Sequence, residues 1–335
     1  MNGIRHRSAY IMRQIILEKP GSFAERTVAQ PSASGEEALV RIHRIGVCGT
    51  DLHAFAGRQP FFNYPRVLGH ELAAEVLEIP TNARGIRIGN RCAIEPYVNC
   101  QTCHACLRGR YNCCERLQVL GVHRDGGMQQ YLNVQVRLLH RSAKLTLDQL
   151  ALVETLGIGA HAVQRAAPTG EDDALIVGAG PIGLAVLSFA RLAAKRVRVL
   201  DLSPERRRFV EDLGVETLAA FDGELADVVF DATGNRESMQ ACFQYLAHGG
   251  RIVFVGLLPG EIAFDDPNFH RRETTLLASR NSCGDFPRII EAIEDGRLDT
   301  SPWITHRMAL SEVPARFEQL KFATGLVKAM IDADA

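Results

Sequence analysis

The chain has 335 residues, of which 46% are hydrophobic and 23% charged, and its formal net charge is −1. At roughly 100–200 residues per domain this length suggests two domains, and the near-zero charge gives neither nucleic acid nor an anionic membrane an electrostatic advantage as partner. No stretch is apolar over the ~20 residues that a membrane-spanning helix needs, and the segment MNGIRHRSAYIM lacks the apolar core of a secretory signal, so we expect a cytoplasmic protein.

Residues 1–157 carry the pattern of a mainly β domain. Short apolar runs alternate with Gly, Pro and Asn breaks, as at Ala38–Ile42, Ala73–Ile79 and Arg91–Ile94. Such runs with frequent glycine favour a barrel-like or sandwich-like unit.

Three segments of this domain contain side chains that can ligate a metal ion. They are GVCGTDLH with Cys48, Thr50, Asp51 and His53, the tripeptide GHE with His70 and Glu71, and ETLGIGAH with Glu154. A thiolate, an imidazole and one or two carboxylates suit a zinc ion that keeps a position for water or substrate. Each segment alone is weak evidence, because a lone His or Cys is more often structural. Together they predict a catalytic zinc site.

A lobe of about residues 95–116 contains five cysteines, four of which have the spacing of metal ligands, namely Cys100, Cys103, Cys106 and Cys114. Three thiolates spaced by three can wrap one ion and the fourth closes a tetrahedron, which predicts a structural zinc site. An iron–sulfur cluster is the alternative, and we rank it lower because nothing else in the sequence indicates electron transfer. Cys113 is the spare member of the lobe, and His104 is expected at the surface.

The other isolated cysteines lie in mostly apolar runs. We expect Cys92, Cys242 and Cys283 to be small core residues. The odd total of nine cysteines and the absence of a secretory signal argue against a disulfide framework.

From residue 158 strands alternate with helices, which predicts βαβ units and a doubly wound parallel sheet. The expected strands are Asp173–Gly178, Arg196–Leu200, Ala226–Phe230 and Arg251–Gly256. The expected helices are Gly183–Leu192, Ser203–Leu213, Glu237–Leu246 and Phe286–Glu294. The remaining tail is too short for a domain, so we expect residues 286–335 to return to the first one and residues 158–285 to form the second.

The run ALIVGAGPIG carries the G-x-G-x-x-G pattern at Gly178, Gly180 and Gly183. It follows an expected strand, opens a helix, and is followed 18 residues later by Asp201 at the end of the next strand, which is the full context of a dinucleotide-binding fold. The first glycine permits the turn, the second lets the backbone approach a pyrophosphate, and the third lets helix and strand pack closely. The expected cofactor-binding set also includes Pro181, Ile182, Val255 and Gly256.

Asp201 is expected to accept hydrogen bonds from the ribose hydroxyls of the adenosine. A carboxylate there repels a 2′-phosphate, which favours NAD over NADP. Arg206 and its two neighbours Arg207 and Arg208 could soften that preference, although a solvated helix face is the simpler interpretation.

With these motifs together, the sequence resembles the zinc-dependent medium-chain alcohol dehydrogenases, most closely the sorbitol and polyol branch with its sugar-acid and threonine relatives. The resemblance runs from about Met12 to Ile331 and rests on GVCGTDLH, GHE, the cysteine lobe, GAGPIG and DATG. It implies a GroES-like catalytic domain interrupted by a Rossmann domain. It also implies hydride transfer from a secondary hydroxyl to NAD, with two zinc ions per subunit, one catalytic and one structural.

The resemblance also assigns roles to individual residues. It makes Cys48, His70 and Glu71 ligands of the catalytic zinc, with Glu154 binding the ion directly or through water. It places Thr50 and His53 in a proton relay and makes Asp51 the residue that orients His70. Two positions depart from the family pattern without removing a ligand, since Ala74 replaces a usual glycine and Thr155-Leu156 a usual Leu-Pro context.

The substrate is less well defined by the sequence. His123 and Arg124 in LGVHRDGG, and Arg280 and Asn281 in ASRNS, lie near positions where the family places substrate contacts. Because arginine can bind a vicinal diol or a carboxylate through two parallel hydrogen bonds, these residues favour a polyol or sugar acid. A surface salt bridge is the alternative for Arg124.

Three other functions remain as alternatives to a polyol or sugar-acid dehydrogenase. They are a threonine-type dehydrogenase, a simple secondary alcohol dehydrogenase, and, ranked lower, a dinucleotide-binding protein without turnover. The resemblance further implies a homodimer or homotetramer, for which the apolar run Thr274–Ala278 is the expected interface strand.

Overall fold

The computed structural model describes residues 10–59 and 62–334. Residues 1–9, which include most of the segment in which we expected no secretory signal, lie outside this description. The chain divides into two compact units. The first unit takes in Met1–Leu107, Cys114–Glu154 and Ile293–Ala335, and the second takes in Arg108–Cys113 and Thr155–Ala292.

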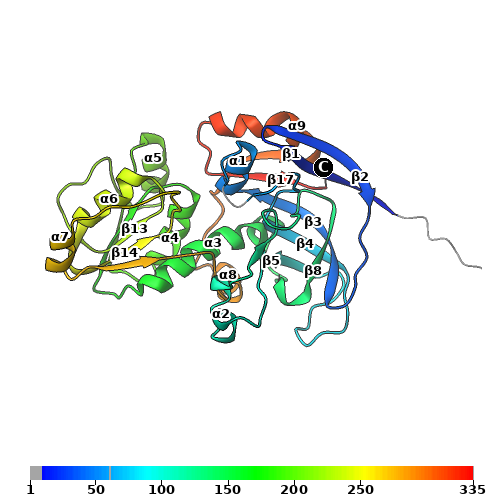
Figure 1. The fold of residues 1–335 in the computed structure, drawn as a ribbon, viewed down its shortest axis with the longest axis horizontal. Coiled ribbons are helices and arrows are strands. Elements are labelled where there is room, and N and C mark those ends of the chain that lie inside the picture. The colour runs from blue at the N-terminus through cyan, green and yellow to red at the C-terminus, as the bar shows by residue number, and fades with distance from the viewer. Residues whose placement is uncertain (1–9, 60–61, 335) are drawn as a thin grey trace, which may run out of the picture. The chain divides into compact units, whose positions relative to one another are not determined.

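The first unit is built on a seven-stranded, mostly antiparallel sheet (Figure 1). Its strands, in spatial order, are β16 (Ile304–Ala309), β17 (Lys328–Asp332), β3 (Glu37–Val47), β4 (Glu71–Glu78), β5 (Arg91–Ile94) and β9 (Leu139–Arg141), with β8 (Tyr131–Gln135) also paired to β3. Two two-stranded sheets complete the β structure of this unit, the hairpin of β1 (Ile11–Lys19) with β2 (Ser22–Ala29) and the pair of β6 (Tyr97–Val98) with β7 (Gln118–Val119), which flank the lobe cysteines. The predicted mainly β domain is therefore confirmed.

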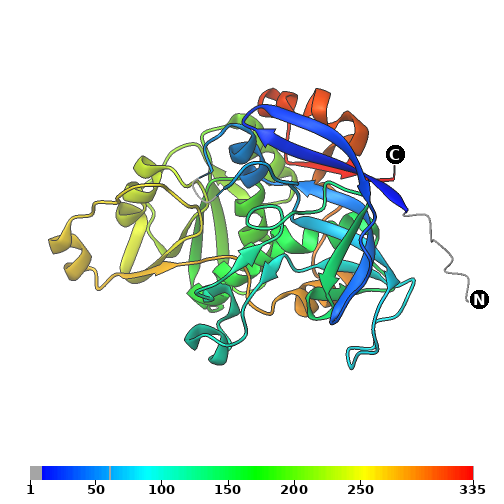
Figure 2. The same ribbon diagram turned by 45° about the vertical axis from the view of Figure 1, so that its right-hand side comes forward.

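Short helices connect or cover these strands. They are α1 (Gly49–Phe55), α2 (His104–Leu107), α9 (Val313–Arg316) and the 3₁₀ turns Val136–Leu138, Leu310–Glu312 and Phe317–Phe322. In both Figure 1 and Figure 2 the β1–β2 hairpin lies beside the C-terminal helical segment, where Phe23 packs edge-on against the buried Phe317 with ring centroids 5.1 Å apart. The core of this unit is one cluster of mainly aliphatic side chains, with Ile15, Ile42, Leu72 and Ile331 among its buried members.

The second unit contains a six-stranded parallel sheet in the order β12 (Glu216–Leu218), β11 (Arg196–Leu200), β10 (Asp173–Val177), β13 (Ala226–Asp231), β14 (Leu246–Phe254) and β15 (Thr275–Ala278). Its helices are α4 (Pro181–Ala190), α5 (Pro204–Asp212), α6 (Arg236–Tyr245) and α7 (Asp266–Arg271), with a 3₁₀ turn at Tyr111–Cys113. The strand order reverses between β10 and β13, which is the switch point of a doubly wound sheet. The predicted doubly wound parallel sheet is confirmed, although β12 and α7 were not predicted.

Two helices contain the boundaries between the units. The first is α3 (Leu147–Ala166), whose residues are buried on nearly every side, and the second is α8 (Phe286–Glu294). The six lobe residues Arg108–Cys113 belong to the second unit, whereas we expected the whole cysteine lobe within the first. The Asn112 side chain explains this, because it hydrogen-bonds within the second unit. Among the described residues, no helix is both long and apolar enough to cross a bilayer.

Candidate functional site

The register of two neighbouring strands, β3 and β4, brings the first group of predicted ligands together. Cys48 follows directly after β3 and is the N-cap of α1, where its N–H donates to Asp51 Oδ2 at 2.9 Å. Glu71 begins β4 opposite Gly46 of β3, and His70 precedes it. A Cβ on Gly46 would lie 2.0 Å from Glu71 Oε2, so only glycine leaves room for this carboxylate.

One ligand atom from each of Cys48, His70 and Glu71 lies within 4.8 Å of the other two. His70 and Glu71 are buried, and Cys48 is partly exposed. Sulfur, imidazole nitrogen and carboxylate oxygen are the donors of a catalytic zinc with an open position. The chemistry of this donor set therefore fits a zinc ion.

Lys328 is a residue of this cluster that sequence reasoning missed. Its Nζ donates to both carboxylate oxygens of Glu71, at 2.6 and 2.8 Å, and both side chains are 1% exposed. Burial alone would lower the pKa of Lys328, but the Glu71 carboxylate and other nearby anions outweigh it and raise the pKa. The available signal was a lysine that begins the apolar run of β17.

Glu154 is buried but is not a member of the three-residue cluster. Its Oε1 accepts a hydrogen bond from the hydroxyl of Tyr97, which is also buried and was not predicted. Burial raises the pKa of Glu154, and the Glu71 charge raises it further, against the lowering effects of His70, Tyr97 and Lys328. Tyr97 therefore fixes the orientation of this carboxylate.

Asp51 lies between the Cys48 backbone and the His70 ring, with Oδ1 3.6 Å from His70 Nδ1. Both of these atoms are buried and have no hydrogen-bond partner, so a small rotation of either group would join them. Burial would lower the pKa of His70, but Asp51 and Cys48 outweigh it and raise the pKa. Burial also raises the pKa of Asp51, despite the opposing effect of His70.

The two predicted relay residues lie on α1, in the turn that Cys48 begins. Thr50 is partly exposed and His53 is exposed. Desolvation lowers the pKa of His53, and Arg58 lowers it further. The ring is therefore a neutral base in contact with water at neutral pH.

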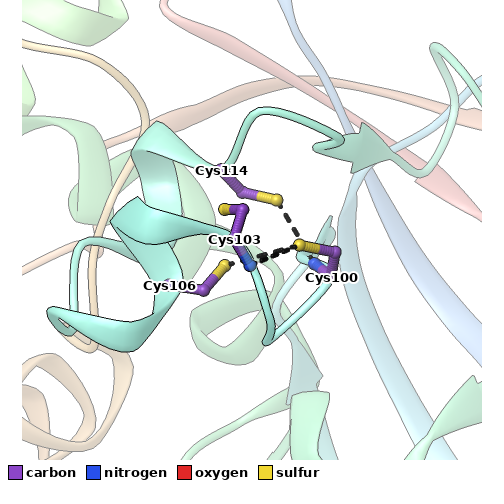
Figure 3. Close-up of side chains that lie close together, drawn as sticks. All are labelled: Cys100, Cys103, Cys106 and Cys114. Atoms are coloured by element: carbon purple, nitrogen blue, oxygen red, sulfur yellow. Dashed lines mark hydrogen bonds between the residues drawn. The ribbon is translucent and has the colours of Figure 1, made fainter.

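The four cysteines of the lobe point toward one another (Figure 3), with their sulfur atoms within 4.8 Å. Hydrogen bonds led by the Thr102 backbone N–H lower the pKa of Cys100 to about 5. Four convergent sulfurs fit a tetrahedral structural metal. Cys113 and His104 are exposed and lie outside this cluster.

The glycine-rich turn connects β10 to α4. Gly178 has φ +99°, a conformation that other residues rarely adopt, and a Cβ on Gly183 would lie 1.8 Å from the Gly178 oxygen. Gly180 is the N-cap of α4 with no side-chain cap, Pro181 and Ile182 begin the helix, and a Cβ on Gly180 would meet nothing within 4 Å. An uncapped helix N-terminus beside open space fits a phosphate group.

Asp201 follows directly after β11, the strand next to β10 in the parallel sheet, and is 8% exposed. Its Oδ2 accepts the Ala179 N–H at 2.7 Å and its Oδ1 accepts the Ser203 N–H at 2.8 Å. Arg206 Nη1 lies 3.8 Å from Oδ2 and is half exposed. The carboxylate is therefore held rigidly beside the glycine-rich turn.

A second carboxylate, Asp231 at the end of β13, holds the turn that follows β13, and its backbone contacts the loop after β14. It is fully buried, and its side chain accepts hydrogen bonds from Thr233, Gly234 and Ser238. Its backbone oxygen accepts the N–H groups of Val255 and Gly256, two predicted cofactor-binding residues. Asp231 was not predicted as a site residue, although it begins the DATG motif.

The predicted substrate residues belong to different units of the chain. His123 and Arg124 are exposed and line a hollow of about 590 Å³ in the first unit, whose wall contains none of the four predicted catalytic zinc ligands. Arg280 and Asn281 follow β15 in the second unit, and Asn281 has φ +53°.

The isolated cysteines also differ from expectation at one position. Cys92 and Cys242 are fully buried as predicted, and burial raises the pKa of Cys92 to about 12. The prediction for Cys283 is wrong, since this residue is partly exposed and its Sγ donates to the Gly109 oxygen at 3.2 Å. It lies in the loop between β15 and α8.

Known proteins match both units. Residues 34–144 match the alcohol dehydrogenase GroES-like domain, and residues 181–295 match the zinc-binding dehydrogenase domain. L-galactonate-5-dehydrogenase of Escherichia coli strain K12 is 40% identical over 322 residues, which cover 92% of this chain and 95% of the relative.

Solved structures agree with these matches. A zinc-binding dehydrogenase of Sinorhizobium meliloti 1021 bound to NADP has a TM-score of 0.90 at 28% identity, over 96% of this chain and 99% of that one. An alcohol dehydrogenase of Escherichia coli CFT073 in complex with NADH has a TM-score of 0.91 at 25% identity, with the same coverage. The predicted fold class, a GroES-like domain with a Rossmann domain, is confirmed.

Proposed function

This chain belongs to the zinc-dependent medium-chain alcohol dehydrogenase family, and from that premise we propose that it oxidises a secondary hydroxyl of a sugar acid or polyol with NAD. The observation that carries the proposal is the cluster of Cys48, His70 and Glu71, whose ligand atoms lie within 4.8 Å. The substrate class follows the 40% identical relative, which is named for L-galactonate. Residues 1–157 with 286–335 are proposed as the catalytic domain and residues 158–285 as the NAD-binding domain.

In the proposed reaction the first unit binds and orients the reacting hydroxyl. Cys48, His70 and Glu71 hold the catalytic zinc, while Glu154, held by Tyr97 outside that cluster, acts through water. When bound, zinc supplies Lewis acidity toward the hydroxyl, and the nicotinamide accepts the hydride. The four lobe cysteines hold a second, structural zinc, which gives two ions per subunit.

The proton of the hydroxyl leaves through α1. Thr50 would accept this proton at Oγ1, the ribose of bound NAD would connect Thr50 to His53, and the exposed His53 ring would exchange the proton with water. The lowered pKa of His53 supports this role, because a neutral imidazole is ready to accept a proton at neutral pH. The buried Asp51 holds the His70 ring beside the metal.

The second unit holds the cofactor by its backbone and by one carboxylate. The glycine-rich turn with Gly178, Gly180 and Gly183 receives the pyrophosphate at the N-terminus of α4. Asp201 accepts the ribose hydroxyls and disfavours a 2′-phosphate, which supports NAD as the physiological cofactor. Arg280, exposed at the end of β15, is proposed to contact the substrate carboxylate or diol.

The proposed cellular location and oligomeric state rest on the cysteines and on strand β15. All nine cysteines are free, which supports a reducing cytoplasmic location. The parallel sheet of the second unit ends at β15, whose residues are largely exposed, and this supports pairing between two copies in a homodimer or homotetramer.

The test is NADH formation by zinc-loaded protein with L-galactonate, other aldonates, polyols, threonine and simple secondary alcohols, each with NAD and NADP. Selective turnover of an aldonate or polyol with NAD is expected. Turnover of threonine or simple alcohols alone would contradict the substrate class. Loss of turnover in His70→Ala with retained NADH binding would separate the metal site from the cofactor site.

A further inference from the structure

Asn112, between the third and fourth cysteines of the lobe, has a side chain that the proposed reaction does not use. It is 5% exposed, and its Nδ2 donates to the Arg280 backbone oxygen at 2.8 Å. The same nitrogen lies 3.0 Å from Nε2 of His161. An amide nitrogen carries two protons, so both bonds form at once when the imidazole nitrogen is the acceptor.

His161 is in the state that this arrangement needs. Burial lowers the pKa of its ring, and Arg165 and Arg288 lower it further against the raising effect of Asp285. A neutral ring that accepts at Nε2 carries its proton on Nδ1, which lies 3.9 Å from Asp285 Oδ2. Asn112, His161 and Asp285 therefore lie in a polar row inside the second unit, with a hydrogen bond between Asn112 and His161 and a longer separation of 3.9 Å between His161 and Asp285.

The row holds a short segment that lacks regular secondary structure. Residues 279–285 connect β15 to α8, and Asn281 within them has φ +53°. Cys283 is fixed at both ends, since its Sγ donates to the Gly109 oxygen at 3.2 Å and its N–H donates to Asp285 Oδ2 at 2.9 Å. Two points of the lobe, Gly109 and Asn112, thus contact this segment.

We propose that Asn112 is a positioning residue that holds the backbone of Arg280, so that the lobe loop at residues 108–113 sets the place of a substrate-contacting side chain. This inference rests on the proposed function for the role of Arg280. It gives the cysteine lobe a part in substrate recognition besides its stabilising effect on its own fold. Asparagine is suited to the task because an aspartate of the same size has no proton to donate to either acceptor.

The experiment compares Asn112→Ala and Asn112→Asp with the matched control Arg110→Ala, an exposed side chain of the same loop. Hydrogen–deuterium exchange of residues 279–285 should be about tenfold faster in both Asn112 variants, because a lost hydrogen bond of about 1.4 kcal/mol corresponds to a factor of ten. It should be unchanged in Arg110→Ala. Zinc content should stay at the wild-type value in all three.

Kinetics then connect the segment to the substrate. We expect KM for the best substrate of the panel to rise about five- to tenfold in Asn112→Ala with kcat nearly unchanged. In an Arg280→Ala background the same change should add little, because the side chain that Asn112 positions is already gone.

Two failures can be told apart. Wild-type exchange in residues 279–285 of both Asn112 variants, or an equal KM effect with and without Arg280, would overturn the positioning role. Wild-type KM in Arg280→Ala would instead overturn the assignment of Arg280 in the proposed function.

Discussion

Lys328 donates to both carboxylate oxygens of Glu71, and neither side chain reaches water. Other acidic groups surround this pair. The charges of Cys48 and Glu154 help to raise the pKa of Lys328, and the charge of Glu71 helps to raise the pKa of Asp51. Lys328 therefore compensates part of this negative charge. Removal of one member of a buried ion pair leaves the other uncompensated, which is costlier than removal of both.

Lys328→Met is expected to lower the free energy of unfolding of the zinc-free protein by about 3–5 kcal/mol. The double variant Lys328→Met/Glu71→Gln should lose markedly less, because the carboxylate that Lys328 pairs with is neutralised as well. Urea unfolding in the presence of a chelator measures both. Equal losses in the single and double variants would show that Lys328 acts through packing instead of charge.

Asp201 is expected to set the choice between NAD and NADP. Asp201→Asn keeps the shape of the side chain and removes its charge, so the affinity for NADPH relative to NADH should rise by about tenfold or more. Arg206→Ala is the matched opposite, because it removes the cation 3.8 Å from the carboxylate and should lower that ratio. Fluorescence titration with both reduced cofactors gives the ratio, and an unchanged ratio in Asp201→Asn would refute this role.

At the scale of elements, the turn between β13 and α6 depends on Asp231. This carboxylate accepts from Thr233, Gly234 and Ser238, and the Thr233 methyl is the atom that a Cβ on Gly178 would approach most closely, at 2.9 Å. Asp231→Ala should therefore weaken NADH binding by tenfold or more, because three partly buried or exposed donors of the turn lose a charged acceptor, and a hydrogen bond to a charged group contributes about 1.5–3 kcal/mol.

Ser238→Ala serves as the graded control for this turn, because it removes one of those donors and leaves the carboxylate in place. Its effect on the NADH dissociation constant should be severalfold smaller than that of Asp231→Ala. Zinc content measured in parallel should match the wild type in both. An Asp231→Ala protein that stays folded and binds NADH normally would contradict the argument.

The elements that the sequence predicts best are those with a periodic hydrophobic pattern and a glycine, proline or similar residue that marks their end. The helix Phe286–Glu294 was predicted with its observed bounds, and β11 likewise. By contrast α3 was not predicted, because its residues are buried on nearly every side and give no amphipathic period. The role of Lys328 could not be predicted from local sequence either, because its partner Glu71 is 257 positions away.

The candidate site divides in the same way. Ligand sets with fixed spacing are accessible to sequence reasoning because short loops leave few arrangements, and the four lobe cysteines do lie together in the structure. The substrate residues were chosen by position in the sequence alone, and His123 and Arg124 line a hollow without a catalytic ligand in its wall. Side-chain direction in irregular loops depends on tertiary contacts that no local pattern encodes.

At the scale of the whole molecule, the main sheets of the two units differ in their edge strands. The sheet of the first unit is extended at its edge by β16 and β17 from the C-terminal segment, whereas the parallel sheet of the second unit ends at β15. Strand β15 spans only Thr275–Ala278, and Leu276 is 37% exposed. An exposed apolar edge strand offers unpaired backbone groups to a second copy of the chain.

Leu276→Lys is therefore expected to shift the protein toward monomer, because a charge on this edge opposes strand pairing between copies. Leu202→Lys is the matched control. Leu202 is 82% exposed on the same unit, but it follows β11, which pairs with a strand on both sides and is therefore not an edge strand. Sedimentation equilibrium measures the mass of each. A wild-type dimer or tetramer that dissociates in Leu276→Lys and persists in Leu202→Lys would support pairing through β15. An assembly that persists in both variants would place the interface elsewhere on the molecule.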